Sequence, residues 1–416
     1  MRNVLIAFDK FKDALTAVEA CQTAAVALHD VQPDWQVSVA PIADGGDGFC
    51  HTLTSVAEGQ FFHTSVHGPQ GAETTATFGM VDTGDIDPAA RLLLDFSPNA
   101  KRLAIIEFAQ SSGIALVPPE ERSPWTSTSY GLGQTIQAAL EQGADSLLIG
   151  LGGSATHDLA LGALQALGFT FFTRHGEPID SYPTPDKWDE IGIIEPPDDL
   201  PKVELRIACD VENPLLGESG AASVFGPQKG LQPGDLGLLE SETARIAIIL
   251  CHACDAGIQT MDTPGAGAAG GAAFGLMNAL DGRLVPGAEL VFAWAGLGDK
   301  LAAADLVITG EGRFDASSLQ GKGPGELAIK VLKQKKELRI LAGSVGEIEN
   351  EAIAKATLAI TPPGTSLSEA IPATAKNLKR CIAQLFSERS AATSSILHES
   401  STAPLRSSGS SSKRKL

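Results

Sequence analysis

The sequence predicts an α/β fold with two domains, one inserted into a parallel-sheet domain that is built from both ends of the chain. Length is the first observation, because 416 residues exceed the size at which a single hydrophobic core usually stops growing. Composition is the second, because 43% of the residues are apolar and 44 are glycines, which suits a large core with many tight turns. The third is the alternation of short apolar runs with helical patterns near both ends.

The two ends of the chain contribute the predicted parallel sheet. Residues 3–8 and 36–42 are strand-like apolar runs, and the segment between them has helical spacing with Thr16 as its N-cap. Toward the other end, three further strand-like runs alternate with helical segments. Such alternation is typical of an open parallel sheet, so we predict a flavodoxin-like domain made of residues 1–60 and 300–389.

Residues 61–299 are predicted to form the inserted α/β domain. Residues 61–82 alternate in hydrophobicity like antiparallel strands, and residues 84–99 are predicted to form a loop with a further strand. Strand-like and helical segments then alternate again, apart from the Pro- and Asp-rich residues 175–201, which we expect to be a surface excursion. The Ser-rich residues 390–416 are predicted to be a disordered tail.

Charge and composition exclude several classes of partner. The net charge is −19, and no cluster of Lys and Arg precedes the last residues, so we expect no binding to nucleic acid. No apolar stretch is long enough to span a membrane, and the first apolar run resembles a strand rather than a signal peptide.

The six cysteines include one C-x-x-C, Cys251 and Cys254, on an apolar helical pattern. We therefore expect a cytoplasmic protein with reduced thiols, and the sequence leaves open whether it forms a homo-oligomer.

Five polar loops, three of them glycine-rich, follow predicted strands, where open α/β sheets bind their ligands. Together they supply what phosphoryl transfer needs, namely glycine backbone around phosphates, carboxylates for a metal ion, and cations. The candidate residues, loop by loop, are Asp9 and Lys12; Asp44, Gly45 and Gly46; Gly152, Gly153, Ser154 and Thr156; Asp210 and Asn213; and Gly310, Glu311, Gly312, Arg313 and Asp315, with Lys322 shortly after.

Several of these loops also have a purely structural interpretation. Asp9 could simply end a strand, and Asp210 could belong to an Asx turn. The third loop lies between a strand and a helical pattern, a setting typical of anion binding by backbone N–H groups, although a crowded turn without a ligand has the same pattern. Lys322 lacks the flanking residues of a Walker A loop. Residues 265–270 fit G-x-G-x-x-G, but no clear strand precedes them, which favours close helix packing.

Eight segments in one order resemble the bacterial glycerate kinase family: FDKFKDALTA, PIADGGDG, IGLGGSATHD, ACDVENPLLG, AASVFGPQKG, PGAGAAGG, DLVITGEGRFDASSLQGK and LAGSVG. The resemblance extends from residue 1 to about residue 388. It implies two α/β domains with the active cleft between them, D-glycerate as substrate, ATP as phosphoryl donor and Mg²⁺ as cofactor. The residues that fall in the family's motifs are Lys12, Asp44, Gly152, Gly153, Ser154, Asp210, Glu311, Arg313, Asp315 and Lys322.

The chain departs from the family pattern at two loops. His157, Leu159 and Ala160 stand where the pattern has an Asn and two glycines, and Asp13-Ala14 replace a Gly-Ser pair. The first departure raises the question of how closely a phosphate can approach that loop. An altered substrate preference would be the consequence.

The hypothesis from the sequence is in-line transfer from ATP to a hydroxyl of D-glycerate, with 2-phosphoglycerate favoured over 3-phosphoglycerate as the product. Asp210, or alternatively Asp44, would orient or deprotonate the hydroxyl. The resemblance and the residue types assign Mg²⁺ to Glu311 or Asp315. The substrate carboxylate or the γ-phosphate is assigned to the cations Arg313, Lys12 or Lys322.

Two alternatives belong to other functional classes. An NADP-dependent oxidoreductase acting on a small hydroxy acid is one, because Gly150-x-Gly152-x-x-Ala155 resembles a dinucleotide fingerprint and Arg174 ends the next predicted strand. The acidic loop around Glu311 would have no role in hydride transfer. A non-catalytic binding module is the other, and the many charged loops at strand ends argue against it.

Overall fold

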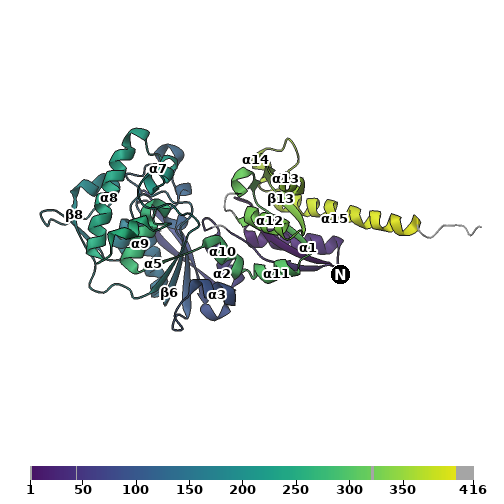
Figure 1. Cartoon of the computed structure of the whole chain (residues 1–416), viewed down its shortest axis with the longest axis horizontal. Coiled ribbons are helices and arrows are strands. Elements are labelled where there is room, and N and C mark those ends of the chain that lie inside the picture. The colour runs from purple at the N-terminus through teal and green to yellow at the C-terminus, as the bar shows by residue number, and fades with distance from the viewer. Residues whose placement is uncertain (1, 44, 320–322, 400–416) are drawn as a thin grey trace, which may run out of the picture.

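The computed structural model describes residues 2–43, 45–319 and 323–399, and two sheets organise them. Figure 1 shows two lobes, one combining the N-terminal and C-terminal segments and the other holding the middle of the chain, with α2 and α10 between them. This arrangement confirms the predicted fold class. The exact division into residues 1–60 with 300–389 and residues 61–299 stays a prediction.

The first sheet is entirely parallel and has the strand order β15-β13-β11-β1-β2. Strand β1 is central and pairs with β11, a strand about 300 residues later in the chain, so that Leu5 lies opposite Val307. The strands are β1 (Asn3–Phe8), β2 (Gln36–Val39), β11 (Leu306–Gly310), β13 (Glu337–Ala342) and β15 (Thr357–Ala359). The helices of this part of the chain are α1 (Ala17–Val31), α12 (Gly323–Lys333), α13 (Glu351–Ala356), α14 (Leu367–Ala370) and α15 (Thr374–Glu399).

Helix α1 begins where the sequence predicts. The Thr16 side chain accepts a hydrogen bond from the Glu19 N–H (3.2 Å), and the Glu19 carboxylate accepts one from the Thr16 N–H (2.9 Å). This reciprocal capping box satisfies two backbone donors that a helix start otherwise leaves without partners. The buried face of α1 packs with strand β1 and with α15, which contributes Phe386.

The second sheet has the order β10-β9-β6-β5-β4-β3. Its strands β5, β6, β9 and β10 are parallel, whereas β3, β4 and β5 pair in antiparallel fashion, which confirms the antiparallel pattern predicted for residues 61–82. The strands are β3 (Gln60–His67), β4 (Glu73–Asp82), β5 (Arg102–Glu107), β6 (Ser146–Gly150), β9 (Glu204–Ala208) and β10 (Arg283–Val285).

The α-helices around this sheet are α2 (Phe49–Val56), α3 (Pro88–Leu94), α4 (Ala109–Ser112), α5 (Tyr130–Glu141), α6 (Leu161–Ala166), α7 (Ala221–Phe225), α8 (Leu236–Ala253), α9 (Ala268–Leu280), α10 (Gly287–Trp294) and α11 (Leu297–Ala303). Two short strand pairs complete the fold: antiparallel β7 (Thr170–Thr173) with β8 (Ile191–Glu195), and parallel β12 (Arg313–Phe314) with β14 (Ser344–Val345). None of the helices in the described ranges is both long and apolar enough to cross a bilayer.

Two segments differ from the sequence-based expectation. Residues 84–99 contain helix α3 rather than a further strand, because Asp87 accepts a hydrogen bond from the Ala89 N–H (2.8 Å) and Pro88 occupies the first helical position. Residues 175–201 include strand β8 and the fully buried Trp188, so this excursion is partly core. Helix α15 continues to Glu399, into the predicted tail, and residues 400–416 lie outside the described residues.

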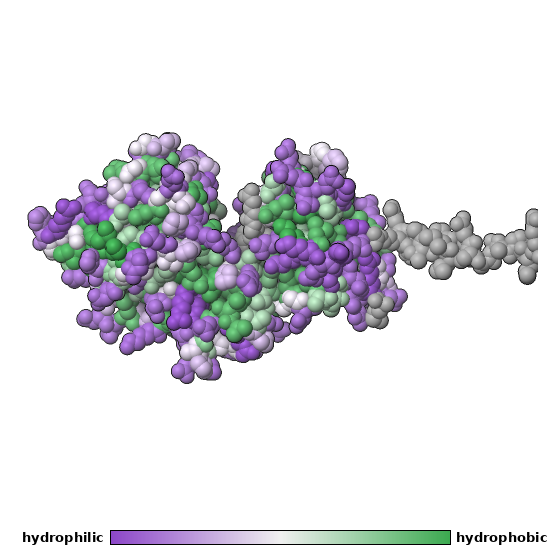
Figure 2. All heavy atoms as spheres, viewed as in Figure 1, coloured by the Kyte–Doolittle hydropathy of each residue, from purple (hydrophilic) through white to green (hydrophobic). Residues whose placement is uncertain are grey.

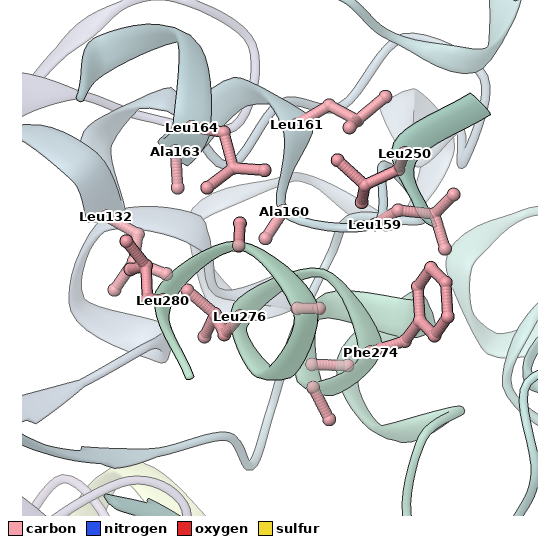
Figure 3. Packing of buried hydrophobic residues seen from close by; sticks show 14 of the residues in the cluster. Leu132, Leu159, Ala160, Leu161, Ala163, Leu164, Leu250, Phe274, Leu276 and Leu280 are labelled. Carbon is pink, nitrogen blue, oxygen red and sulfur yellow. The ribbon is translucent and has the colours of Figure 1, made fainter. Parts of the chain in front are cut away.

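Buried side chains connect the two sheets. One cluster contains Val307 of β11 and Leu148 of β6, joined through Leu53 of α2 and Leu290 of α10. Another cluster lies on the far side of the second sheet, where α9 packs against residues 159–164 (Figure 3). This second cluster supports the loop that follows β6, and that loop is central to the site described below.

Candidate active site

The loop after β2 packs directly on the loop after β6, which brings the edges of the two sheets together. The Gly152 N–H donates to the Gly45 carbonyl at 3.0 Å. A Cβ atom at Gly152 would lie 2.4 Å from the Gly46 Cα, closer than two carbon atoms can approach. The glycines of these two loops are therefore needed for backbone contact, and this contact shapes a cavity.

This cavity, of about 420 Å³, is lined by loops from both sheets, and we call it the glycine-lined cavity. Figure 2 shows the surface hollowed between the two lobes. The structure brings six residues predicted from the sequence to its wall: Gly45, Gly46, Gly152, Gly153, Ser154 and Asp210. Phosphates bind in such concave sites because glycine backbone permits close approach.

Asp210 is held in a defined orientation at the wall of this cavity. It follows β9, and its two carboxylate oxygens accept from the Ala288 N–H in the first turn of α10, at 2.9 and 3.1 Å. The start of a helix favours a negative charge. The side chain is exposed and can therefore meet a ligand while its orientation is fixed from behind.

A second cavity, of about 430 Å³, lies beside the first and is lined by the loop after β1, the start of α2 and the second sheet; we call it the β1-loop cavity. Lys10 and Asp47 line both cavities. The Lys10 ammonium lies 3.9 Å from an Asp9 carboxylate oxygen and 3.8 Å from one of Asp47. Sequence reasoning missed Lys10, although its position two residues after a strand was a usable signal.

Glu107, at the end of β5, is a further residue that sequence reasoning missed. Its side chain is 2% exposed, and its carboxylate accepts from the N–H groups of Gly48 (3.0 Å) and Cys50 (3.3 Å). Burial, and secondarily the charge of Asp47, raises the pKa of Glu107 to about 7. The signal was a carboxylate that directly ends an apolar run of the sequence.

The loop after β11 lies against the loop after β1. The Gly312 N–H donates to the Lys10 carbonyl at 3.3 Å, and a Cβ atom at Gly310 would lie 1.8 Å from the Leu341 carbonyl oxygen. Asp9 is 5% exposed within this contact, whereas Lys12 is exposed and lines the β1-loop cavity. The two loops therefore present their charged groups along one edge of the first sheet.

Arg313 and Asp315 form an ion pair on this edge, with 2.8 Å between the Arg313 Nε and an Asp315 carboxylate oxygen. Hydrogen bonds from the Ser317 side chain, and then from Arg313, lower the pKa of Asp315 to about 2. Asp315 is therefore ionised at neutral pH. Glu311, the other predicted metal ligand, is 8% exposed.

The loop after β6 does not lead directly into the start of a helix, as the sequence predicted. Helix α6 begins only at Leu161, and a buried turn separates it from the glycines. Backbone donors of the loop are used within the protein, since the Ala155 N–H donates to the Ser112 carbonyl at 2.9 Å. Thr156 has no exposed surface. A bound anion would accordingly need donors other than the start of α6.

A buried lysine lies directly behind this loop. Lys229, in the GPQKG segment, is 1% exposed, and its ammonium donates to the Ser154 hydroxyl (2.9 Å) and to the Thr156 carbonyl (2.6 Å). Burial lowers the pKa of Lys229 to about 7, and the nearby Asp158 opposes this shift. Sequence reasoning saw GPQKG as a loop and missed the lysine.

The first departure from the family pattern, at residues 157–160, points away from the glycine-lined cavity, whereas Asp13 and Ala14 of the second departure line the β1-loop cavity. Leu159 and Ala160 have φ values of 54° and 59°, the left-handed region that favours glycine. Both side chains are fully buried, and Leu159 packs toward Phe274 of α9 (Figure 3). His157 is also fully buried and its Nε2 lies 2.9 Å from the Thr243 hydroxyl. These three substitutions therefore do not line the glycine-lined cavity.

The remaining predicted residues fall outside these two cavities or outside the described residues. The Asn213 side chain donates to the Ser219 carbonyl at 2.7 Å and so stabilises a turn. Asp44 and Lys322 lie outside the described residues. The G-x-G-x-x-G pattern at residues 265–270 is explained by packing, because a Cβ atom at Gly270 would lie 2.2 Å from the Thr156 carbonyl oxygen.

The carboxylates of the candidate site suit a metal ion that binds together with the phosphates of a substrate. Within the described ranges, no three His, Cys, Asp or Glu side chains are grouped so as to hold a metal ion by themselves. Mg²⁺ commonly binds through one or two carboxylates together with substrate phosphates. The ionised Asp315, with Glu311 on the same loop, offers oxygen donors of this type, so the residues present fit such an ion.

Comparison with known proteins points to one protein family. The profile described as "Glycerate kinase family" matches residues 4–389. The "Glycerate kinase" of Halalkalibacterium halodurans is 36% identical over 89% of this chain and 94% of its own length, and the "Glycerate 2-kinase" of Escherichia coli is 35% identical over 91% and 95%. A crystal structure described as a candidate glycerate kinase 2 from Salmonella typhimurium LT2 has 30% identity and a TM-score of 0.73, covering 94% of this chain and 99% of that one.

Proposed function

Because this chain belongs to the glycerate kinase family, we propose that it transfers the γ-phosphoryl group of ATP to a hydroxyl of D-glycerate. Family membership makes it an ATP-dependent phosphotransferase. The observation that carries the proposal is the glycine-lined cavity, where backbone from two glycine loops, the Asp210 carboxylate and the Lys10 ammonium meet. The NADP-dependent oxidoreductase loses its support, because Gly150 and Gly152 are explained by contact with the loop after β2.

The two adjoining cavities suit two substrates. The glycine-lined cavity would bind the phosphates of ATP, since its walls permit close approach of backbone to anionic oxygens. Lys10 lines both cavities and can neutralise charge on the transferred group. Lys12 and Arg313 are the candidate partners of the glycerate carboxylate or the γ-phosphate, and Lys12 already lines the neighbouring cavity.

Asp210 is the proposed group that orients or deprotonates the glycerate hydroxyl. The Ala288 N–H fixes its carboxylate, so the acceptor need not be reorganised when the substrate binds. Mg²⁺ would neutralise charge on the transferred phosphoryl group, and Glu311 and Asp315 are its candidate protein ligands. Asp315 is ionised over the whole physiological pH range and is therefore ready for such a role.

The proposed product is 2-phosphoglycerate rather than 3-phosphoglycerate. Its support is the similarity to the "Glycerate 2-kinase" of Escherichia coli, which is 35% identical over 91% of this chain.

The test is a coupled assay of ADP release with D-glycerate, L-glycerate, glycerol or no acceptor, followed by phosphorus NMR of the product. We expect ADP release that requires both D-glycerate and Mg²⁺, and a product phosphorylated at carbon 2. ADP release that is independent of the acceptor, or its absence with D-glycerate, would contradict the proposed activity. A signal from 3-phosphoglycerate would overturn the regiochemistry alone.

A further inference from the structure

We infer that Lys229 is a positioning residue that directs the Ser154 hydroxyl proton into the glycine-lined cavity, where the hydroxyl binds a phosphate oxygen of the nucleotide. The inference rests on the proposed function for the identity of the ligand. It replaces the backbone anion site that the sequence predicted at this loop, because α6 begins seven residues after Ser154.

The direction of the hydrogen bond between the two side chains follows from their chemistry. A lysine ammonium has three donors and no acceptor, whereas a hydroxyl has one donor and can accept as well. In its protonated form, which predominates below the pKa of about 7, the Lys229 Nζ therefore donates in the 2.9 Å contact and the Ser154 Oγ accepts. The single hydroxyl proton of Ser154 is thereby left for another acceptor.

The position of Ser154 determines where that acceptor can be. Ser154 lines the glycine-lined cavity and is 7% exposed, whereas Lys229 is 1% exposed and approaches it from the core. With the ammonium on the buried side, the hydroxyl proton is available on the side of the cavity. A phosphate oxygen accepts hydrogen bonds and can therefore bind this hydroxyl proton.

The second contact of Lys229 fixes the backbone of the same loop. Its ammonium also donates to the Thr156 carbonyl at 2.6 Å, two residues after Ser154. The loop is thus held at a side chain and at a carbonyl by one buried group. Asp158, whose carboxylate is held by the Ser129 N–H and hydroxyl at 2.7 Å each, is a buried carboxyl near enough to influence the lysine electrostatically.

Burial of the lysine explains how it contributes without touching the ligand. A charge in a medium of low polarity acts over a longer range than an exposed one, and a hydroxyl that accepts from an ammonium becomes a better donor. A nucleotide in the cavity would therefore experience the lysine through Ser154. An exposed lysine at the cavity mouth would instead be screened by water and salt.

The test is a double-mutant cycle of Lys229→Met and Ser154→Ala, read out at pH 6, where Lys229 is mainly an ammonium, by calorimetric binding of the Mg²⁺ complex of a non-hydrolysable ATP analogue. Each single variant is expected to weaken binding by about tenfold or more, the range of a hydrogen bond in which one partner is charged. The double variant should bind no more weakly than Lys229→Met alone, because the serine depends on the lysine. Additive losses, or unchanged binding by either single variant, would overturn the inference.

The matched control is Thr243→Val, which removes the buried hydroxyl hydrogen-bonded to His157 without touching Ser154. Its nucleotide affinity should equal that of the wild type, and an equal loss would mean that general loosening of the core explains Lys229→Met. If Lys229→Met does not fold, Ser154→Ala decides the matter: wild-type affinity in that variant contradicts the inference.

The proposed function and this inference fail separately. Turnover of D-glycerate by the wild type together with an additive cycle would leave the kinase standing and remove the role of Lys229. A non-additive cycle without turnover of D-glycerate would support the role of Lys229 and contradict the proposed kinase activity. Absence of analogue binding to the wild type would contradict the inference directly.

Discussion

The loops of the two sheets meet at one site but present charge in opposite ways. At the edge of the first sheet, Arg313 and Asp315 form an exposed ion pair, with the Arg313 side chain 71% exposed. At the edge of the second sheet, the loop after β6 presents glycine and serine, and the cation, Lys229, lies buried behind it. The first edge can bind a ligand by direct charge contact, whereas the second combines close backbone approach with a charge acting from the interior.

This difference predicts different consequences of mutation. Groups on the exposed edge contribute little to stability because water screens them, so their substitution should affect ligands selectively. Groups on the buried edge are part of the packing, so their substitution should affect the shape of the cavity and the fold together.

The largest effect is expected for Gly152→Ala at the buried edge. The new Cβ would lie 2.4 Å from the Gly46 Cα and 2.7 Å from its nitrogen, so the two loops must separate. We expect the specificity constant kcat/KM to fall by roughly a hundredfold or more, because small displacements of positioning groups have such costs. Steady-state kinetics and thermal unfolding would measure this.

Gly84→Ala is the control for this prediction, since a Cβ atom there would meet no atom of the described residues within 4 Å. Its activity should match that of the wild type. Wild-type kinetics in Gly152→Ala would show that the two loops are not held in contact.

The second effect concerns Asp210→Asn. An asparagine can still accept from the Ala288 N–H, so the melting temperature should change little, while kcat should fall by about 10²-fold or more if the carboxylate acts on the hydroxyl. Asp145→Asn is the matched control, because its carboxylate accepts from the Lys101 and Arg102 N–H groups at the opposite edge of the same sheet. Full turnover by Asp210→Asn would remove Asp210 from the mechanism.

The third effect is a pH dependence caused by Glu107. Its pKa is about 7 in the fold against an ordinary value of 4.5, so between these values the unfolded chain releases a proton that the folded chain keeps. The contribution of Glu107 to stability is thus fully present below pH 4.5 and is lost as the pH rises through 7. Relative to Glu107→Gln, the wild type should lose about 3 kcal/mol of unfolding free energy over this range.

Denaturant unfolding at several pH values would measure the difference between wild type and Glu107→Gln. Glu73→Gln, an exposed carboxylate on β4, serves as the control and should reproduce the wild-type profile. A constant difference between wild type and Glu107→Gln across this pH range would contradict the raised pKa.

The comparison of the two edges also explains what the sequence could predict. The parallel sheet was predictable because its strands are apolar runs separated by helical patterns, and the charged residues after β1, β9 and β11 stand out at strand ends. Gly152 and Ser154 were predicted because they directly follow the apolar run of β6. Helix α3 was missed because it spans seven residues, too few for a helical periodicity to show.

The roles of Lys229 and Glu107 could not be predicted from the sequence because they depend on burial. A lysine in GPQKG is solvated in most loops, and only the packing of this loop behind residues 154–156 makes its ammonium a partner of Ser154. Glu107 similarly acquires its raised pKa from burial and, secondarily, from the charge of Asp47, which lies far earlier in the chain. Such long-range contacts leave no local pattern.

The smallest effect is expected for Arg313→Ala at the exposed edge. Its ion pair with Asp315 is a surface pair, and such pairs contribute about 0–1 kcal/mol, so the melting temperature should hardly change. If Arg313 binds the substrate carboxylate or the γ-phosphate, the KM of the corresponding substrate should rise by about tenfold, as expected for one lost charge-assisted contact. Initial rates with D-glycerate and ATP varied separately would identify which substrate is affected.

Lys355→Ala provides the matched control for Arg313→Ala, because it removes an exposed ion pair with Glu351 (3.1 Å) on α13. Both variants should retain wild-type stability, and only Arg313→Ala should change a KM. If Arg313→Ala instead lowered stability and left both KM values unchanged, the exposed edge would be structural, and ligand recognition would rest on the buried edge and Lys10.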